Sequence, residues 1–135
     1  MERRGDWSHG AGRTRVRCEL FAVGRDLLLV ITGGDAHVGA VATARPADRP
    51  GDPPAVRVET VPGHRETELA REGAAALAAA TGRVAVAVCG IHRDAATPAE
   101  IRGMVAAARA GIAAARRAAA DGPAQQRDPG PAGQR

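Results

Sequence analysis

Three of the four histidines follow closely after a glycine, in segments that come directly after predicted strands. They are His37 in GGDAH, His64 in PGH and His92 in CGIH, and Asp35 and Asp94 lie beside two of them. Glycine lets a backbone approach a ligand closely, and a helix that starts after such a turn favours an anion at its N-terminus. Imidazole and carboxylate groups together also suit a divalent metal ion. The pattern predicts an anion site or a metal site, and the alternative is that the glycines only form turns and the histidines are merely polar.

Two arginines add to the anion interpretation. Arg65 and Arg93 each follow a histidine and could bind a phosphate through two N–H groups, although both could equally be surface residues. The Gly33-Gly34 pair is a weak phosphate-loop signal, because neither a GxGxxG pattern nor a Walker lysine accompanies it. No cysteine or serine occupies a typical nucleophile turn, and there is no tyrosine or lysine to serve as acid or base. We therefore expect a binding protein and not an enzyme.

Composition excludes several classes of protein. The formal charge of +4 lies largely in residues 1–17, and aromatic residues make up 1% of the chain, so a nucleic-acid partner is not expected. The longest apolar stretch, residues 27–31, is far too short to cross a bilayer, and no signal peptide is apparent, so we expect a cytoplasmic protein without a membrane partner. Cys18 and Cys89 match no metal-binding or disulfide spacing, and we expect both to be buried core residues.

Hydrophobic periodicity predicts an α/β domain. Alternation or apolar runs predict strands at residues 16–22, 27–32, 38–44, 56–60 and 84–88, with 27–32 and 84–88 central, the former buried on both faces, and 56–60 at an edge. Helical spacing predicts one helix over 65–80, ended by Gly82, and a second from Thr97 to about Ala120 with Ile101 facing inward. The expected architecture is a mixed β-sheet covered by two helices.

The two ends of the chain lack periodicity. Residues 1–12 and 121–135 are expected to be disordered tails around a single domain at residues 13–120. A core built mainly from Val, Leu, Ile and Ala buries little apolar area per residue, so we also expect a homodimer that covers the remaining apolar surface.

Three segments resemble one small family when they are taken together and in order. They are residues 31–41 (ITGGDAHVGAV), 62–66 (PGHRE) and 88–97 (VCGIHRDAAT). They are similar to the LpdD-like proteins, which are encoded beside UbiD-type hydroxyarylic acid decarboxylases, and the similarity covers roughly residues 15–115. Two positions depart from the family pattern: Thr67 replaces a usual acidic residue, and Ala95 replaces a common asparagine.

The resemblance implies a chaperone for reduced prenylated flavin mononucleotide (prenylated FMN). Such a protein would take the cofactor from a UbiX-type prenyltransferase and assist maturation of a UbiD-type decarboxylase. The implied fold resembles the proteasome-assembly-chaperone type, a homodimer. From the residues themselves we predict cofactor contacts at Gly33, Gly34, Asp35, His37, Gly63, His64, Arg65, Gly90, His92 and Arg93, and metal ligands at His37, His64, His92, Asp35 and Asp94. A structural small subunit of the decarboxylase and a small metal-dependent enzyme remain as alternatives.

Overall fold

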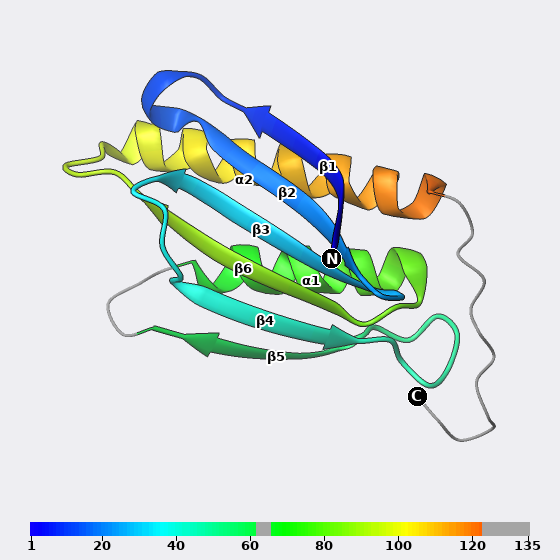
Figure 1. Ribbon diagram of the computed structural model, residues 1–135. Coiled ribbons are helices and arrows are strands. Elements are labelled where there is room, and N and C mark those ends of the chain that lie inside the picture. Colours follow the sequence, from blue (N-terminus) through cyan, green and yellow to red (C-terminus); the bar gives the residue numbers. More distant parts are fainter. Residues whose placement is uncertain (62–65, 123–135) are drawn as a thin grey trace.

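One mixed sheet with two helices forms the protein (Figure 1). The computed structural model describes residues 1–61 and 66–122. The strands are β1 (Glu2–His9), β2 (Val16–Val23), β3 (Asp26–Gly34), β4 (Ala40–Arg45), β5 (Ala55–Thr60) and β6 (Ala85–His92). The helices are α1 (Thr67–Thr81) and α2 (Pro98–Asp121), and a 3-10 turn, η1 (Gly12–Thr14), joins β1 to β2. The expected α/β class, a mixed sheet covered by helices, is confirmed.

The strand order is β1-β2-β3-β6-β4-β5, so β6 is inserted between two strands that precede it in the chain. Strands β3 and β6 run parallel, and every other pairing in the described sheet is antiparallel. Their register places Gly34 beside His92 at the carboxyl ends of both strands. The sheet therefore brings two of the three histidine segments to one end of the molecule. As predicted, β5 is an edge strand.

Both helices pack on the same face of the sheet, α1 over β4 and β6 and α2 over β1 and β2 (Figure 1). Alternate residues of neighbouring strands point toward them in register, as Leu20, Leu29 and Ala87 do, and all three are fully buried. A Cβ atom at Gly111 of α2 would lie 2.3 Å from the Cys18 sulfur, so this glycine lets the helix approach the sheet closely. Small residues compensate for the scarcity of large ones by shortening the distance between the layers.

The second face of the sheet has no helix over it in the described part of the chain. Its centre is apolar, and the side chains there are only half-buried, as at Leu28, Val30, Val86 and Val88. The prediction that residues 27–32 are buried on both faces is therefore wrong for the single chain. Residues 27–31 are uniformly apolar, as the prediction assumed. However, α1 and α2 both lie on the same side of the sheet, so neither helix covers the other side of this strand.

The N-terminal residues also differ from the expectation of a disordered tail at 1–12. Residues 2–9 form β1, which pairs antiparallel with β2 along nearly its whole length. Trp7 lies opposite Cys18 and packs against the core, while on the other face Asp6 binds the Arg17 guanidinium through both carboxylate oxygens, at 2.9 and 2.7 Å. This segment is ordered by the packing of Trp7, by strand pairing with β2 and by ion pairs. Its composition alone did not predict that it would fold.

The helix boundaries follow local signals. Thr97 caps α2 with the expected capping box, and Gly82 ends α1 in the left-handed conformation at φ 66°. Ile101 does not face inward as predicted, because its side chain is 50% exposed in the first turn of α2. At the other end, Asp121 belongs to α2 and Gly122 caps it, and residues 123–135 of the predicted C-terminal tail lie outside the described residues. Among the described residues, no helix combines the length and apolar character that a bilayer span needs.

Candidate functional site

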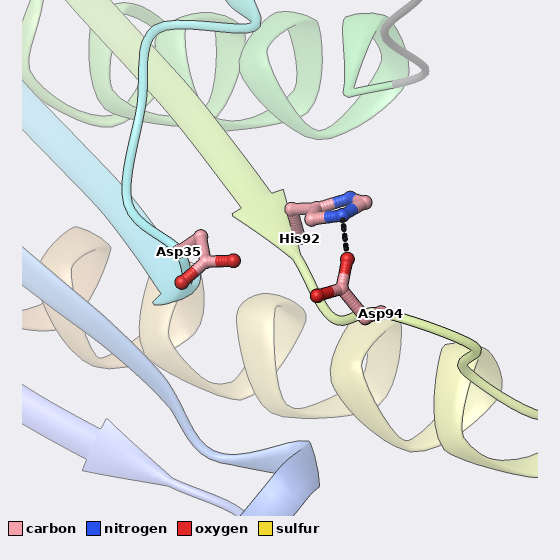
Figure 2. A group of neighbouring side chains, drawn as sticks. All are labelled: Asp35, His92 and Asp94. Atoms are coloured by element: carbon pink, nitrogen blue, oxygen red, sulfur yellow. Dashed lines mark hydrogen bonds and ion pairs between the residues drawn. The ribbon is translucent and has the colours of Figure 1, made fainter.

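Asp35, His92 and Asp94 form a cluster at the carboxyl ends of β3 and β6 (Figure 2). One ligand atom from each lies within 4.8 Å of the others. The His92 ring makes a 2.9 Å hydrogen bond through Nε2 to the Asp94 carboxylate, and the Asp35 backbone N–H donates to the His92 carbonyl at 2.9 Å. The three side chains are exposed and could contact a cation from solvent together.

The backbone beneath this cluster depends on Gly34. Its φ of 66° is in the left-handed region, and a Cβ atom there would overlap the His92 carbonyl oxygen. The close approach lets the chain turn directly after the strand, which places Asp35 beside His92. A glycine that the sequence associated with phosphate binding thus has a clear packing role.

His37 lies beside the cluster, edge-on to the His92 ring, with the ring centroids 6.5 Å apart. Its Nδ1 donates to the Asp35 carbonyl at 2.8 Å, because a carbonyl can only accept. Its Nε2 lies 3.1 Å from Oε1 of Glu66, so a proton carried by the ring or by the carboxyl group bridges these atoms. In this arrangement both ring nitrogens are engaged, and His37 supports the loop instead of presenting a nitrogen to the cluster.

Glu66 was not assigned a role from the sequence, although it is part of the second motif. Its side chain is buried at the start of α1, and Oε1 also accepts a hydrogen bond from the Ile91 backbone at 3.2 Å. Its other oxygen, Oε2, has no hydrogen-bond partner within the described residues. A Cβ atom at Gly39 would lie 2.4 Å from Oε2, so that glycine makes room for the carboxyl group. The sequence did contain a signal for this residue: Glu66 is a charged residue in the PGHRE motif and lies directly before α1.

Gly90 and Gly33 complete the packing around these loops. A Cβ atom at Gly90 would overlap the backbone carbonyl of His37, so the loop after β3 crosses β6 at this glycine. Gly33 is buried and would place a Cβ atom 3.0 Å from the Arg15 carbonyl. Gly34 and Gly90 thus bring the His37 and His92 segments together, whatever ligand the site takes, whereas Gly33 lets β3 lie close to the backbone before β2.

The remaining predicted site residues are placed as follows. The Arg93 guanidinium donates to the carbonyl oxygens of Arg13, at 3.1 Å, and Gly12, at 3.4 Å, and so contacts η1. Gly63, His64 and Arg65 lie outside the described residues. The structure thus brings together Asp35, His37, His92 and Asp94 from the predicted set.

The N-terminus of α2 lies just beyond Asp94 and is capped by its own residues. Glu100 N–H donates to the Thr97 hydroxyl at 3.1 Å, and the Thr97 N–H donates to the Glu100 carboxylate at 3.0 Å. The Thr97 N–H, followed by the Arg13 guanidinium, lowers the pKa of Glu100 and keeps it ionised. An anion approaching this helix end meets a carboxylate, so the helix dipole alone does not make it an anion site.

The two cysteines are core residues, as expected. Cys18 and Cys89 are fully buried, and this burial raises the pKa of each thiol to about 12. A thiol protonated at neutral pH is a poor nucleophile and a poor metal ligand. The chemistry of the site therefore rests on carboxylates and imidazoles.

Comparison with known proteins gave a match to one family model. A search of curated proteins found no match. A family model described as the prenylated flavin chaperone LpdD-like domain matches residues 10–119. That span contains both described histidine segments, the three cluster residues, Glu66 and every strand of the sheet except β1. The chain belongs to the prenylated flavin chaperone LpdD-like family.

Proposed function

We propose that this protein binds reduced prenylated FMN through a divalent cation held by Asp35, His92 and Asp94. The observation that carries the proposal is the chemistry of the cluster, which joins two carboxylates and one imidazole at exposed strand ends. Oxygen and imidazole ligands in this combination suit Mg²⁺, Mn²⁺ or Zn²⁺. The family description supports a prenylated flavin as the ligand.

Charge favours a bridging cation over direct contact with the phosphate. A flavin phosphate beside Asp35 and Asp94 would place three anionic groups together, which is strongly unfavourable without a positive charge between them. Arg93, one of the two arginines expected to bind phosphate, donates instead to backbone carbonyls of η1. A divalent cation would bind both carboxylates and leave coordination positions for phosphate oxygens.

The residues around the cluster would hold the ligand and carry out no chemistry on it. Glu66 and His37 fix the loop after β3, and the exposed side chains of Val38 and Val61 provide apolar surface next to that loop. Neither buried thiol is available as a nucleophile. We infer a non-catalytic chaperone that receives the cofactor from a UbiX-type prenyltransferase in the cytoplasm and assists maturation of a UbiD-type decarboxylase.

We also infer that the protein is a homodimer, joined through the second face of the sheet. Phe21, Leu28, Val30, Val86 and Val88 lie at the centre of this face, and no helix of the described chain covers them. Charged residues surround this apolar centre: Arg3, Asp6, Arg17 and Glu19 on the β1–β2 side and Arg57 and Glu59 on β5. An apolar centre with a charged rim is typical of an interface, and both signs of charge in the rim suit a second copy.

Light scattering at micromolar concentration tests the dimer. We expect twice the chain mass for the parent and the single-chain mass for Val30→Glu, which places a charge at the centre of the face. Ala106→Glu adds the same charge on the exposed side of α2 and should remain dimeric. A monomeric parent would contradict the inference.

The flavin proposal is tested by anaerobic co-expression with the prenyltransferase. We expect the purified parent protein to carry prenylated FMN, measured by absorbance and mass spectrometry, and Asp94→Asn and His92→Ala to lose it. Asp48→Asn removes the same charge in the loop after β4, at the opposite end of the sheet, and should retain the cofactor. Calorimetric titration of the purified chain with Mn²⁺ tests the cation separately.

The outcomes also separate the two alternatives. A protein that carries no flavin yet forms a stable complex with the decarboxylase would be a structural subunit. Turnover of a hydroxyarylic acid by the purified chain with metal, lost in His92→Ala, would indicate a metal-dependent enzyme. Unchanged decarboxylase activation by His92→Ala would overturn the proposed site.

A further inference from the structure

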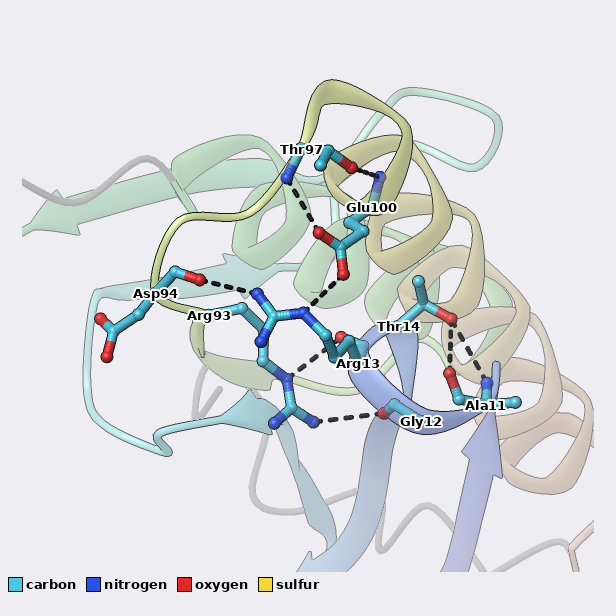
Figure 3. Close-up of polar contacts among 8 residues, drawn as sticks. All are labelled: Ala11, Gly12, Arg13, Thr14, Arg93, Asp94, Thr97 and Glu100. Atoms are coloured by element: carbon cyan, nitrogen blue, oxygen red, sulfur yellow. Dashed lines mark hydrogen bonds and ion pairs between the residues drawn. The ribbon is translucent and has the colours of Figure 1, made fainter.

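An arginine from the N-terminal segment reaches across to the loop that carries Asp94 (Figure 3). Arg13, in η1, donates from Nη2 to the Asp94 carbonyl oxygen at 2.6 Å and from Nε to the Glu100 carboxylate at 2.6 Å. A single planar guanidinium therefore joins the loop between β6 and α2 to the first turn of the helix. Two donors in fixed geometry restrain the loop more than one point charge would.

The contact is reciprocal. Arg93, which lies between the two cluster residues His92 and Asp94, donates to the carbonyl oxygens of Arg13 and Gly12 (Figure 3). Each segment thus holds the other through an arginine side chain bound to the opposite backbone. We refer to these contacts between Arg13, Arg93 and their carbonyl partners as the arginine clamp.

Packing holds η1 in place on α2. The Thr14 hydroxyl donates to the Ala11 carbonyl at 3.0 Å and closes the turn on itself. A Cβ atom at Gly103 would lie 2.9 Å from the Thr14 methyl carbon, so the turn rests directly on the helix at this glycine. The turn that carries Arg13 is therefore packed against α2. Movement of Asp94 relative to α2 would require breaking the hydrogen bonds of the arginine clamp.

The loop that the clamp holds contains an unfavourable backbone conformation. Ala95 has φ 50°, the one positive φ among the described non-glycine residues. An alanine in the left-handed region is disfavoured by contact of its Cβ atom with the backbone, whereas asparagine adopts this region more readily. A loop with such a residue needs support from outside, and Arg13 bonds to the carbonyl immediately before it.

We propose that Arg13 is a positioning residue that holds Asp94 and His92 in the geometry needed for the cation. This proposal rests on the cation site proposed above, because it concerns the same cluster. Arg13 does not itself contact the cluster side chains: it acts on the Asp94 backbone, and Asp94 in turn binds the His92 ring. The segment around residue 13 is therefore part of the functional site and not a separate tail.

The test uses purified full-length chains with two readouts, one with metal and one without. Mn²⁺ affinity is measured by calorimetry, and the His92 ring nitrogens are observed by NMR in the metal-free protein. For Arg13→Ala we expect about tenfold weaker Mn²⁺ binding, the low end of the range for residues that orient metal ligands, and a changed His92 ring spectrum. Arg109→Ala is the matched control, because Arg109 makes a similar bidentate pair with Glu72 far from the cluster.

Rescue separates positioning from general stability. Ala95→Asn added to Arg13→Ala should recover most of the lost Mn²⁺ affinity, since asparagine favours the required loop conformation without the clamp. Thermal stability of Arg13→Ala should fall no further than that of Arg109→Ala, because exposed ion pairs contribute little.

Unchanged Mn²⁺ affinity and an unchanged His92 spectrum in Arg13→Ala would overturn the proposal, as would failure of Ala95→Asn to restore any affinity. If the parent protein binds no Mn²⁺, the cation proposal fails, and the His92 spectrum still decides whether Arg13 positions the cluster.

Discussion

Replacement of Gly39 by alanine should displace the buried Glu66 carboxyl group and loosen the His37 loop. The new Cβ atom would lie 2.4 Å from Oε2 and 2.7 Å from Cδ of Glu66. Because carbon atoms without a bond between them approach to about 3.5 Å, the carboxyl group must retreat by roughly 1 Å. Its bonds to His37 Nε2, at 3.1 Å, and Ile91 N, at 3.2 Å, would then exceed hydrogen-bond distance.

The cost follows from overpacking and from these two bonds. We expect Gly39→Ala to lower the free energy of unfolding by about 2–3 kcal/mol. In a Glu66→Ala background the obstructing carboxyl group is absent, and the same substitution should cost less than about 1 kcal/mol, a coupling of about 2 kcal/mol between the two positions. Urea unfolding of the parent, both single variants and the double variant measures this coupling.

A matched control shows whether the effect is specific to this pair. Gly111→Ala also creates a clash, with the sulfur of Cys18 at 2.3 Å, on a helix far from Glu66. Its cost should be the same with and without Glu66→Ala. If Gly39→Ala proves equally costly in both backgrounds, the carboxyl group does not fill the space beside Gly39, and the account of the His37 loop is wrong.

Trp7→Ala should lower the free energy of unfolding by about 2 kcal/mol in urea, because the ring packs β1 against the core, and an unchanged midpoint would mean that β1 adds no stability. Cys18 and Cys89 should not react with a thiol reagent at pH 8 in the native protein, since burial raises each pKa to about 12, whereas rapid labelling would contradict this. Glu100 has a lowered pKa, caused first by the Thr97 N–H, so its contribution to stability is full above its ordinary value of 4.5 and is lost as the pH falls through the lowered value. The difference in urea midpoint between the parent and Glu100→Gln should therefore shrink in acid, and a constant difference would oppose this reasoning.

Elements with strong local signals could be predicted from the sequence. Thr97 and Glu100 form the expected capping box, and Gly82 ends α1 as expected, because caps depend on residues a few positions apart. The ordering of β1 could not be predicted in the same way. Its stability comes from Trp7 against the core and from Asp6 paired with Arg17, contacts that exist only once the sheet has formed.

The residues of the site also divide into those that could be predicted from the sequence and those that could not. Asp35, His92 and Asp94 could be expected to meet, because strand ends carry them and parallel strands share an end. Burial of Glu66 could not be expected, since its partners lie 25 and 29 positions away in other segments. The role of Arg13 could not be predicted from the sequence for the same reason, because its partners are more than 80 residues away in the chain.

The place of β6 in the sheet has a consequence for how the chain folds. Strands β3 and β4 follow one another in the sequence, but β6 separates them in space, so the edge of each stays unpaired until residues 85–92 have been synthesised. The β1–β2–β3 meander and the β4–β5 hairpin can form early from local contacts, whereas the central parallel pairing must close a loop of about 50 residues and is slow for entropic reasons. Until that step, two open strand edges are available for pairing with other chains. Insertion of β6 thus both completes the sheet and creates the His92 end of the site, so a chain stalled before this step would have neither a continuous six-stranded sheet nor a binding site.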